Sequence, residues 1–187
     1  MDASHSGCDC HRYIEPLIRE RAAELLVVSP YIDAHYARVL VDVGRRKRVR
    51  VITSADSEGA LRRAIAGSGV GMLRHAKALL VIGAMAALTA FLGLYFLFIV
   101  LAALLAGIIG AGYIRHRRIL GSNIRVRVAR GMFVHEKLYI SDGTAITGSA
   151  NLTYSGLHRN MEHVEVTRKR ERIGALRAHF RLLWRRV

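Results

Sequence analysis

The feature that most constrains this chain is an uninterrupted apolar run in its middle. Residues 78–114 are 37 consecutive positions without Asp, Glu, Lys, Arg or His. A helix of about 20 residues crosses a hydrocarbon core about 30 Å thick, whereas a single helix of this length would reach roughly 55 Å. The run therefore predicts a hairpin of two transmembrane helices over residues 77–114.

Basic residues flank this run on both sides. Arg74, His75 and Lys77 precede it, and four basic residues follow at 115–118. Positive residues stay on the cytoplasmic side of a membrane, so both ends of the hairpin are expected there, with a turn near residues 93–95. The start of the chain is polar, which argues against a secretory signal. We therefore expect a cell-membrane protein with two helices and cytoplasmic termini. A re-entrant hairpin and a helical dimerisation arm are the alternatives.

The charge lies outside the apolar run. The chain has 187 residues, a formal net charge of +15 and 52% hydrophobic residues, a composition that excludes a disordered protein. About 150 residues remain beyond the run, enough for one compact domain. The expected organisation is a polar N-terminal segment (1–12), one domain in two parts (13–76 and 115–187), and the hairpin inserted between them.

Hydrophobic periodicity predicts an α/β domain, a mixed sheet flanked by helices. Apolar runs at 25–29 and 49–53 predict buried strands around a helix over 34–43, and a second helix is expected over 58–66. Glycines at 67–71 indicate a linker. Further strands are expected at 124–128, 133–141, 144–147 and 161–167, with a tight turn at Asp142 and Gly143. From Arg170, apolar residues at helical spacing predict a closing amphipathic helix: Ile173, Leu176, Phe180, Leu183, Trp184 and Val187.

The segment 134–166 holds the residues suited to chemistry. On a strand, residues two apart share a face, so His135 and Lys137 point the same way and place a nucleophile or base beside a cation. Gly148, Ser149 and Asn151 follow, and a turn there offers amide and hydroxyl donors to a tetrahedral anion. Glu162, two residues after Asn160, is suited to fixing a histidine tautomer. None of this chemistry requires a metal or cofactor.

These residues resemble the HKD signature of the phospholipase D superfamily. The match covers eight positions: His135, Lys137, Asp142, Gly148, Ser149, Asn151, Asn160 and Glu162. The family usually has six residues between the Asp and the Gly-Ser pair, and this chain has five, which predicts a turn shortened by one residue.

The resemblance implies cleavage of a phosphodiester in two steps. His135 would attack phosphorus and form a phosphohistidine, and the histidine of a second signature would protonate the leaving oxygen. Lys137 and Asn151 would bind phosphate oxygens, Ser149 would assist and Glu162 would orient His135. Asp142, Gly148 and Asn160 would be structural. The chain contains one signature, so the two-histidine mechanism predicts a homodimer.

Nucleic acid, DNA or RNA, is the favoured substrate, because single-signature members of the family resemble nucleases and this domain is strongly basic. Arg125, Arg127 and Arg159 are candidate substrate-binding residues, and a basic cluster at 45–50 would also attract polyanions. A basic site at a bilayer suits anionic phospholipid equally well, so a phospholipase or phosphatidyltransferase is the enzymatic alternative. A catalytically silent membrane protein that binds nucleic acid or lipid is the alternative from another class.

Two smaller groups of residues have both a functional and a structural interpretation. Cys8, Cys10 and His11, with His5 nearby, resemble a metal clip, but a reduced cytosolic pair is the default for such cysteines. Asp33, His35 and Asp56 follow predicted strands and could line a pocket, although residues at such positions usually cap helices or form turns.

Overall fold

The computed structural model describes residues 2–67, 80–88, 93, 97, 99–108, 123–131 and 134–187. The chain divides into two compact units, one made of Met1–Ile65 with Ser122–Val187 and the other of Ala66–Gly121. The first unit contains the whole sheet and all the signature residues.

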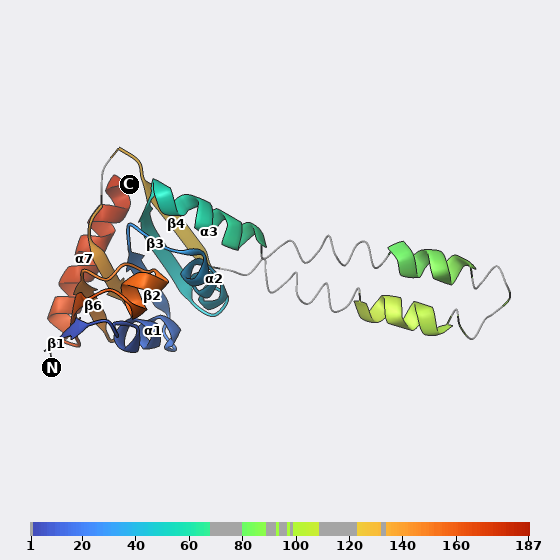
Figure 1. Cartoon of the computed structure of the whole chain (residues 1–187), viewed down its shortest axis with the longest axis horizontal. Coiled ribbons are helices and arrows are strands. Elements are labelled where there is room, and N and C mark those ends of the chain that lie inside the picture. The colour runs from blue at the N-terminus through green and yellow to red at the C-terminus, as the bar shows by residue number, and fades with distance from the viewer. Residues whose placement is uncertain are drawn as a thin grey trace. The chain divides into compact units, whose positions relative to one another are not determined.

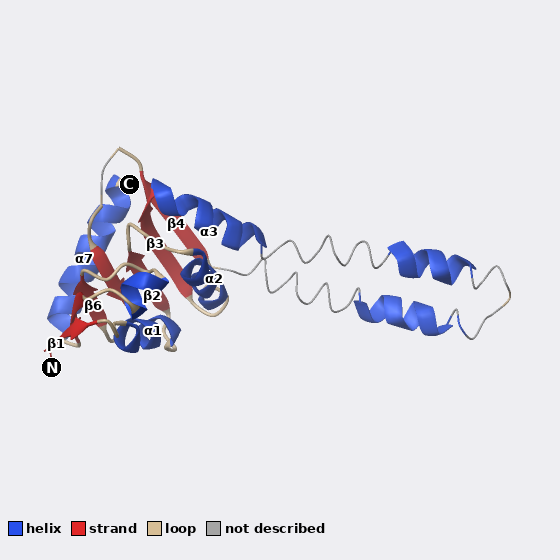
Figure 2. Ribbon diagram, in the orientation of Figure 1, coloured by secondary structure: helices blue, strands red, loops and turns tan. Residues whose placement is uncertain are grey.

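The first unit is built on a seven-stranded mixed sheet in the order β1-β7-β6-β5-β2-β3-β4 (Figures 1 and 2). The parallel part comprises β2 (Glu24–Val28), β3 (Arg48–Ser54) and β4 (Ile124–Ala129). The antiparallel part comprises β5 (Lys137–Ile140), β6 (Ala145–Gly148), β7 (Glu162–Thr167) and the edge strand β1 (Asp2–Gly7). β2 joins the two parts because it pairs with both β3 and β5.

Helices cover both faces of this sheet and enclose two cores. On one face lie α1 (His11–Arg19), α2 (Ala34–Val43), α3 (Ala55–Gly67) and α6 (Tyr154–His158). The other face is covered by α7 (Arg170–Arg186). Leu25 and Val27 of β2 face the first core, whereas Leu26 and Val28 face the second. This strand is buried on both faces, which explains why it reads as a continuous apolar run.

Most predicted elements of the sheet and its helices are confirmed. α2 has the predicted bounds, and the six apolar residues expected on the closing helix all belong to or pack against the core beneath α7. The predicted strand 133–141 is the main departure, because β5 begins only at Lys137. β5 pairs with β2, whose last paired residue is Val28 opposite Leu138, and residues 134–136 lie beyond that end.

Two elements at the start of the chain are absent from the sequence-based prediction. The expected polar segment 1–12 contains β1, which pairs antiparallel with β7. β1 is an edge strand with mostly exposed side chains, so it lacks the apolar alternation by which strands are recognised. α1 then buries Ile14, Leu17 and Ile18 at helical spacing.

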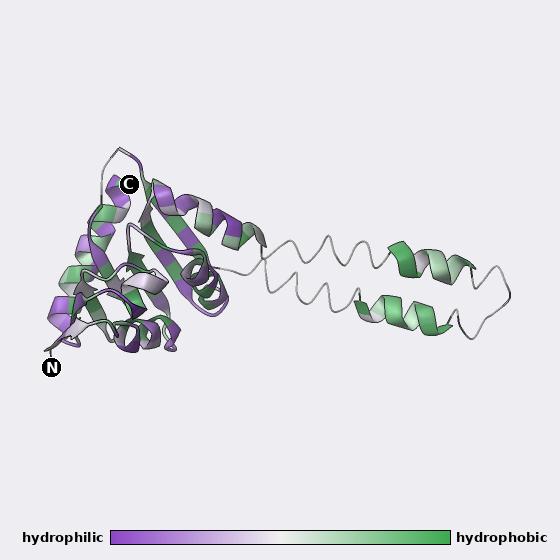
Figure 3. Ribbon diagram, in the orientation of Figure 1, coloured by the Kyte–Doolittle hydropathy of each residue, from purple (hydrophilic) through white to green (hydrophobic). Residues whose placement is uncertain are grey.

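In the second unit, the described residues of the apolar run are helical over 80–88, at 97 and over 99–108, and Gly93 lies in a turn with φ of 71°. Figure 3 shows that these helices are predominantly hydrophobic. Several large apolar side chains are exposed: Leu80, Val81, Met85, Leu88, Leu97, Ile99, Val100 and Leu104.

Within the described ranges, none of the helices has both the length and the apolar character needed to cross a bilayer. The glycine linker after Gly67, the basic flanks at 74–77 and 115–118, and the rest of the expected hairpin lie outside the described residues.

Candidate active site

The signature residues other than Asp142 gather at one end of the sheet. Lys137 opens β5 opposite Gly148, the last residue of β6, and Gly148 in turn lies opposite Val164 of β7. Val28 pairs with Leu138, so this end is also the carboxyl end of the parallel strand β2. Ligands of open α/β sheets bind outside the carboxyl ends of the parallel strands, where this site lies.

His135 and Lys137 are in direct contact, as their spacing predicts. Lys137 is only 4% exposed, and its Nζ donates to the His135 carbonyl oxygen at 2.7 Å. The same Nζ lies 3.3 Å and 3.4 Å from Nε2 and Nδ1 of the exposed His135 ring. Burial lowers the pKa of Lys137, and the negative charge of Glu162 opposes that shift. The site thus holds a cation against the ring of its expected nucleophile.

Glu162 is held by two other signature residues. Ser149 Oγ donates to Glu162 Oε2, and Asn160 Nδ2 donates to Glu162 Oε1 at 3.3 Å. Ser149 is itself fixed to β7, because its Oγ accepts from the backbone N–H of His163 at 3.0 Å and its N–H donates to the His163 carbonyl at 2.9 Å. These contacts give the carboxylate one defined orientation.

Gly148 is required because β6 and β7 approach closely at this point. A Cβ built on Gly148 would lie 2.0 Å from the His163 carbonyl oxygen and 2.9 Å from Cα of Val164. No side chain fits at such distances, so the glycine of the signature has a steric cause. The close approach also brings Ser149 within reach of Glu162.

Asn151 has an unsatisfied polar atom at the site. Its Oδ1 is buried and lacks a hydrogen-bond partner among the described residues, whereas its backbone carbonyl accepts from Thr153 N–H at 2.8 Å. Buried polar atoms are nearly always paired, and exceptions often mark functional positions. Next to it, the buried Tyr139 hydroxyl donates to the Ala150 carbonyl at 2.8 Å, and burial raises the pKa of this phenol.

Asp142 lies at the opposite end of the sheet from His135. One carboxylate oxygen accepts from Ala23 N–H at 2.6 Å, and the other lies 3.3 Å from the Arg177 guanidinium. The predicted turn is closed by the Ser141 N–H, which donates to the Thr144 carbonyl at 2.9 Å. Although this connection is one residue short, β5 and β6 still pair Lys137 with Gly148.

The candidate arginines divide between the two faces of the sheet. Arg125 and Arg127 lie on the α7 face, where the Arg127 guanidinium donates to the Trp184 carbonyl and lies 5.0 Å from the Trp184 ring. The structure therefore does not bring these two residues to the signature. Arg159 follows α6 near the site, and its guanidinium lies 5.3 Å from the Tyr154 ring centroid.

Asp33 caps a helix, as the structural interpretation proposed. Its two oxygens accept from Tyr36 N–H at 2.9 Å and from Tyr154 N–H at 2.6 Å, so it links the start of α2 to α6. His35 and Asp56 are exposed in the first turns of α2 and α3.

The possible metal clip at the N-terminus is not assembled. Cys10 is fully buried, and His11 Nδ1 lies 3.4 Å from the Leu157 carbonyl, whereas His5 is 2.5 Å from Asp9. Cys8 is exposed. In the part of the chain that the structure describes, no three His, Cys, Asp or Glu side chains converge on a common point that could hold a metal.

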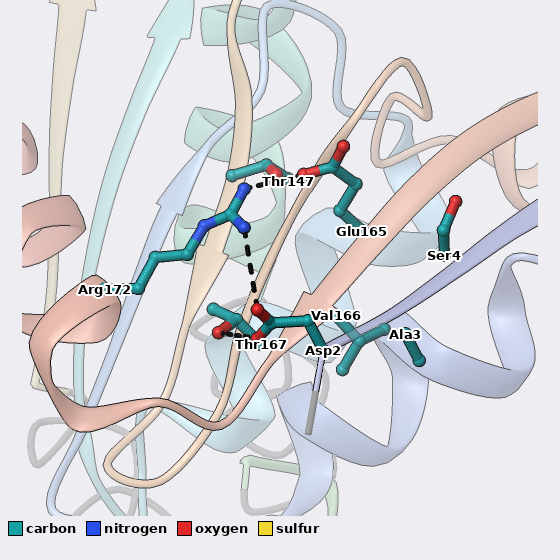
Figure 4. Close-up of a pocket in the computed structure, with 8 residues that line it drawn as sticks. All are labelled: Asp2, Ala3, Ser4, Thr147, Glu165, Val166, Thr167 and Arg172. Carbon is teal, nitrogen blue, oxygen red and sulfur yellow. Dashed lines mark hydrogen bonds and ion pairs between the residues drawn. The ribbon is translucent and has the colours of Figure 1, made fainter.

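A separate cavity of about 200 Å³ is lined by residues of β1, β6, β7 and α7 and by none of the signature residues. Figure 4 shows the Arg172 side chain between Glu165 and Asp2, and its guanidinium lies 2.7 Å from the Glu165 carboxylate and 3.9 Å from the Asp2 carboxylate. Two carboxylates already neutralise this arginine, so the cavity offers no site for an anion.

The family model described as "Cardiolipin synthase, PLD-like domain" matches residues 16–184. The chain therefore belongs to the phospholipase D-like superfamily of phosphodiesterases. No curated protein matches the chain.

Several solved structures share the fold of this chain. Nuc from Salmonella typhimurium, a phospholipase D family member, has a TM-score of 0.59 at 14% identity, with 99% of this chain and 95% of that chain covered. NucT from Helicobacter pylori has a TM-score of 0.57 at 13% identity, with 99% and 96% covered.

Phosphatidylserine synthase from Haemophilus influenzae Rd KW20 has a TM-score of 0.53 at 13% identity, with 98% of this chain but only 38% of that chain covered. At these identities the likeness concerns the fold alone.

Proposed function

We propose that this protein is a membrane-anchored, homodimeric phosphodiesterase that cleaves nucleic acid through a phosphohistidine. The observation that carries the proposal is the contact between the exposed His135 ring and the buried Lys137 ammonium, beside the Ser149–Glu162 hydrogen bond. A nucleophile next to a desolvated cation is suited to attack on a phosphodiester, because phosphoryl transfer depends on positioning and charge neutralisation.

In the first step, a ring nitrogen of His135 forms a bond to phosphorus and the bond from phosphorus to the leaving oxygen breaks. Lys137 and Asn151 neutralise and orient the phosphate oxygens, and the histidine of a second signature gives its proton to the leaving oxygen. In the second step, that histidine takes a proton from water, whose oxygen replaces His135 on phosphorus.

The homodimer supplies the second histidine. The chain has one HKD signature, and His75 with Lys77 lacks the Asp and the Gly-Ser-x-Asn residues that follow His135. Two copies related by a two-fold axis would bring together the same end of the sheet, with its signature, from each protomer.

The membrane anchor is the apolar run. Leu80 is 76% exposed and Ile99 is 64% exposed within this chain, and apolar surface of this extent on a helix is favourable only against other apolar groups. A bilayer supplies them for both helical segments.

Single cysteines at Met72 and Ser122, in a cysteine-free variant, test the topology. A membrane-impermeant maleimide applied to sealed vesicles of known orientation should label both positions from the cytoplasmic side only. Labelling from opposite sides would contradict the hairpin.

The strong positive charge of the chain favours nucleic acid over the lipid of the anchoring membrane. The formal net charge is +15 at pH 7, and such a charge suits a polyanion.

Cleavage assays with purified protein in detergent and EDTA test the activity. The expected result is cleavage of DNA or RNA that is lost in His135→Ala, with a phosphohistidine trapped in the wild-type protein. Release of phospholipid head groups without nucleic-acid cleavage would replace the nuclease by the phospholipase or phosphatidyltransferase alternative. If neither nucleic acid nor phospholipid is turned over, the protein would be the catalytically silent binding protein of the third alternative.

A further inference from the structure

We infer that Tyr154 and Arg159 form a stacking subsite for a nucleobase next to the scissile phosphate, and that this subsite gives the protein a preference for single-stranded nucleic acid. The inference rests on the proposed nucleolytic function and specifies its substrate. It is carried by a column of stacked side chains at the surface, none of which belongs to the HKD signature.

The column consists of four side chains in consecutive contact. The His11 and His158 rings stack with centroids 4.3 Å apart, and the Tyr154 ring stacks on His158 with centroids 4.5 Å apart. Both rings are near-parallel to His158, so they must occupy its two opposite faces. The Arg159 guanidinium lies 5.3 Å from the Tyr154 centroid and ends the column on the solvent side. Tyr154 is 48% exposed.

The inner part of the column is fixed by hydrogen bonds. His158 Nε2 lies 3.1 Å from the hydroxyl of Tyr36, which is buried and donates to Glu15 at 2.7 Å. The Tyr154 backbone is also fixed, because its N–H donates to Asp33 at 2.6 Å. The Tyr154 ring is therefore a fixed support for the Arg159 guanidinium, and a ligand that stacks on this pair loses little free energy to the ordering of Tyr154.

The column lies within the segment that carries the signature. α6, which provides Tyr154 and His158, connects Asn151 to Glu162, and Arg159 immediately precedes Asn160, which donates to Glu162 at 3.3 Å. Because α6 starts three residues after Asn151, the inference places the nucleoside that neighbours a phosphodiester held at Lys137 and Asn151 against this helix.

The chemistry of this pair fits an unpaired base. Aromatic rings and arginine guanidinium groups can both stack on the face of any base, so the Tyr154–Arg159 pair can bind a single strand whatever its sequence. A base in a duplex is already stacked on both faces and cannot lie on this pair without being extruded. Single strands should therefore bind better than duplexes.

Five proteins are compared on three substrates. The proteins are wild type, Tyr154→Ala, Tyr154→Phe and Arg159→Ala, with Arg181→Ala as the matched arginine control, because Arg181 is exposed on α7 across the sheet. The substrates are a single-stranded oligonucleotide, its duplex, and a single strand of the same length made of abasic nucleotides.

The wild-type protein is expected to have a KM roughly tenfold lower for the normal single strand than for the abasic strand, because one stacked base contributes about that much. Tyr154→Ala should lose this difference and leave kcat on the abasic strand unchanged. Tyr154→Phe and Arg181→Ala should show the same ratio of the two KM values as the wild-type protein. The ratio for Arg159→Ala should lie between that of the wild-type protein and that of Tyr154→Ala.

Two failures remain distinguishable in this experiment. Wild-type kinetics of Tyr154→Ala on all three substrates would overturn the subsite while leaving the nuclease intact. An absence of His135-dependent cleavage of every substrate, including the abasic strand, would instead contradict the proposed function.

Discussion

Gly148 and Lys137 lie opposite each other in neighbouring strands and are constrained in different ways. Gly148 has no room for a side chain, because β7 passes 2.0 Å from where its Cβ would be. Lys137 has an ammonium group with little water around it, because the residue is 4% exposed. Both constraints are consequences of tight strand packing at the site.

Gly148→Ala should destabilise the domain by about 1–3 kcal/mol, because the new methyl group forces β6 away from β7. Each kcal/mol corresponds to a fall in Tm of roughly 2–4 °C. Cleavage activity should decrease by more than the loss of folded protein explains, because Ser149 moves relative to Glu162. Thermal unfolding and a cleavage assay measure the two effects. Gly143→Ala is the control, because a Cβ there meets nothing within 4 Å. Equal Tm values for the two variants would contradict the steric argument.

Raising the pH should affect activity and stability in opposite directions through Lys137. Its pKa is below the usual 10.5 because burial disfavours the ammonium form. The folded chain therefore binds this proton more weakly than the unfolded chain, so this group increases the free energy of unfolding as the pH rises from the lowered pKa to 10.5. Over the same window the ammonium group is lost from the site, and kcat/KM should fall.

The pH dependence of kcat/KM and of the urea midpoint can be measured on the wild-type protein and on Lys137→Met, a neutral variant of similar volume. The variant should lack this contribution to the pH dependence of stability. An alkaline limb of kcat/KM centred at or above 10.5 in the wild-type protein would show that burial does not shift this lysine.

The spacing of the signature predicted that its residues come together in pairs, since Lys137 contacts His135, Ser149 donates to Glu162, and the charge of Glu162 acts on Lys137. The same reasoning could not place Arg125 and Arg127. Alternation in a strand shows that two residues share a face but not which face holds the site, and these two lie on the face covered by α7, where Arg127 contacts Trp184. The stacking of Tyr154 on His158 was also missed, although their spacing of four residues on a helix was visible.

Among the elements, α7 shows how a single helix closes one face of the sheet. Its buried Phe180 packs against residues of β2, β5 and β6, and the ring stacks on Trp184 with centroids 5.7 Å apart. Helical periodicity predicted this element because its apolar stripe faces a core. β1 could not be predicted in the same way, because its stability comes from pairing with β7 and not from an apolar stripe.

Phe180→Ala should lower the free energy of unfolding by about 3–5 kcal/mol, since it removes a fully buried ring and leaves a cavity under α7. Leu182→Ala, at a position 56% exposed on the same helix, should change it by less than about 0.5 kcal/mol. Urea unfolding of the two variants, followed by Trp184 fluorescence, gives the comparison. A similar loss in both variants would mean that α7 does not pack as described.

At the scale of the whole molecule, the proposed mechanism makes activity a property of two chains. If every active site needs His135 from both protomers, a protomer with His135→Ala also inactivates its wild-type partner. Equal co-production of the two chains should then leave about one quarter of the activity of the same amount of wild-type protein, as random pairing requires. Activity proportional to the wild-type fraction, about one half, would show that each chain acts alone.

That assay needs a control for the association itself. Tagged wild-type and untagged His135→Ala chains should be recovered together by the tag, and sedimentation in detergent should give the mass of two chains. A single-chain mass with full cleavage activity would contradict the homodimer.

The pairing of β2 with β5 has a consequence for how the chain reaches its fold. Val28 and Leu138 are adjacent in the sheet, yet the entire apolar run separates them along the chain. Closing a loop adds only about 0.6 kcal/mol for each doubling of its length, so the insertion lowers the stability of the folded state little. Contacts between residues far apart in the sequence nevertheless form slowly. During synthesis, β2 therefore leaves the ribosome with one side unpaired and stays so until β5 follows. Early insertion of the apolar run into a membrane would shorten the search by bringing the two halves together.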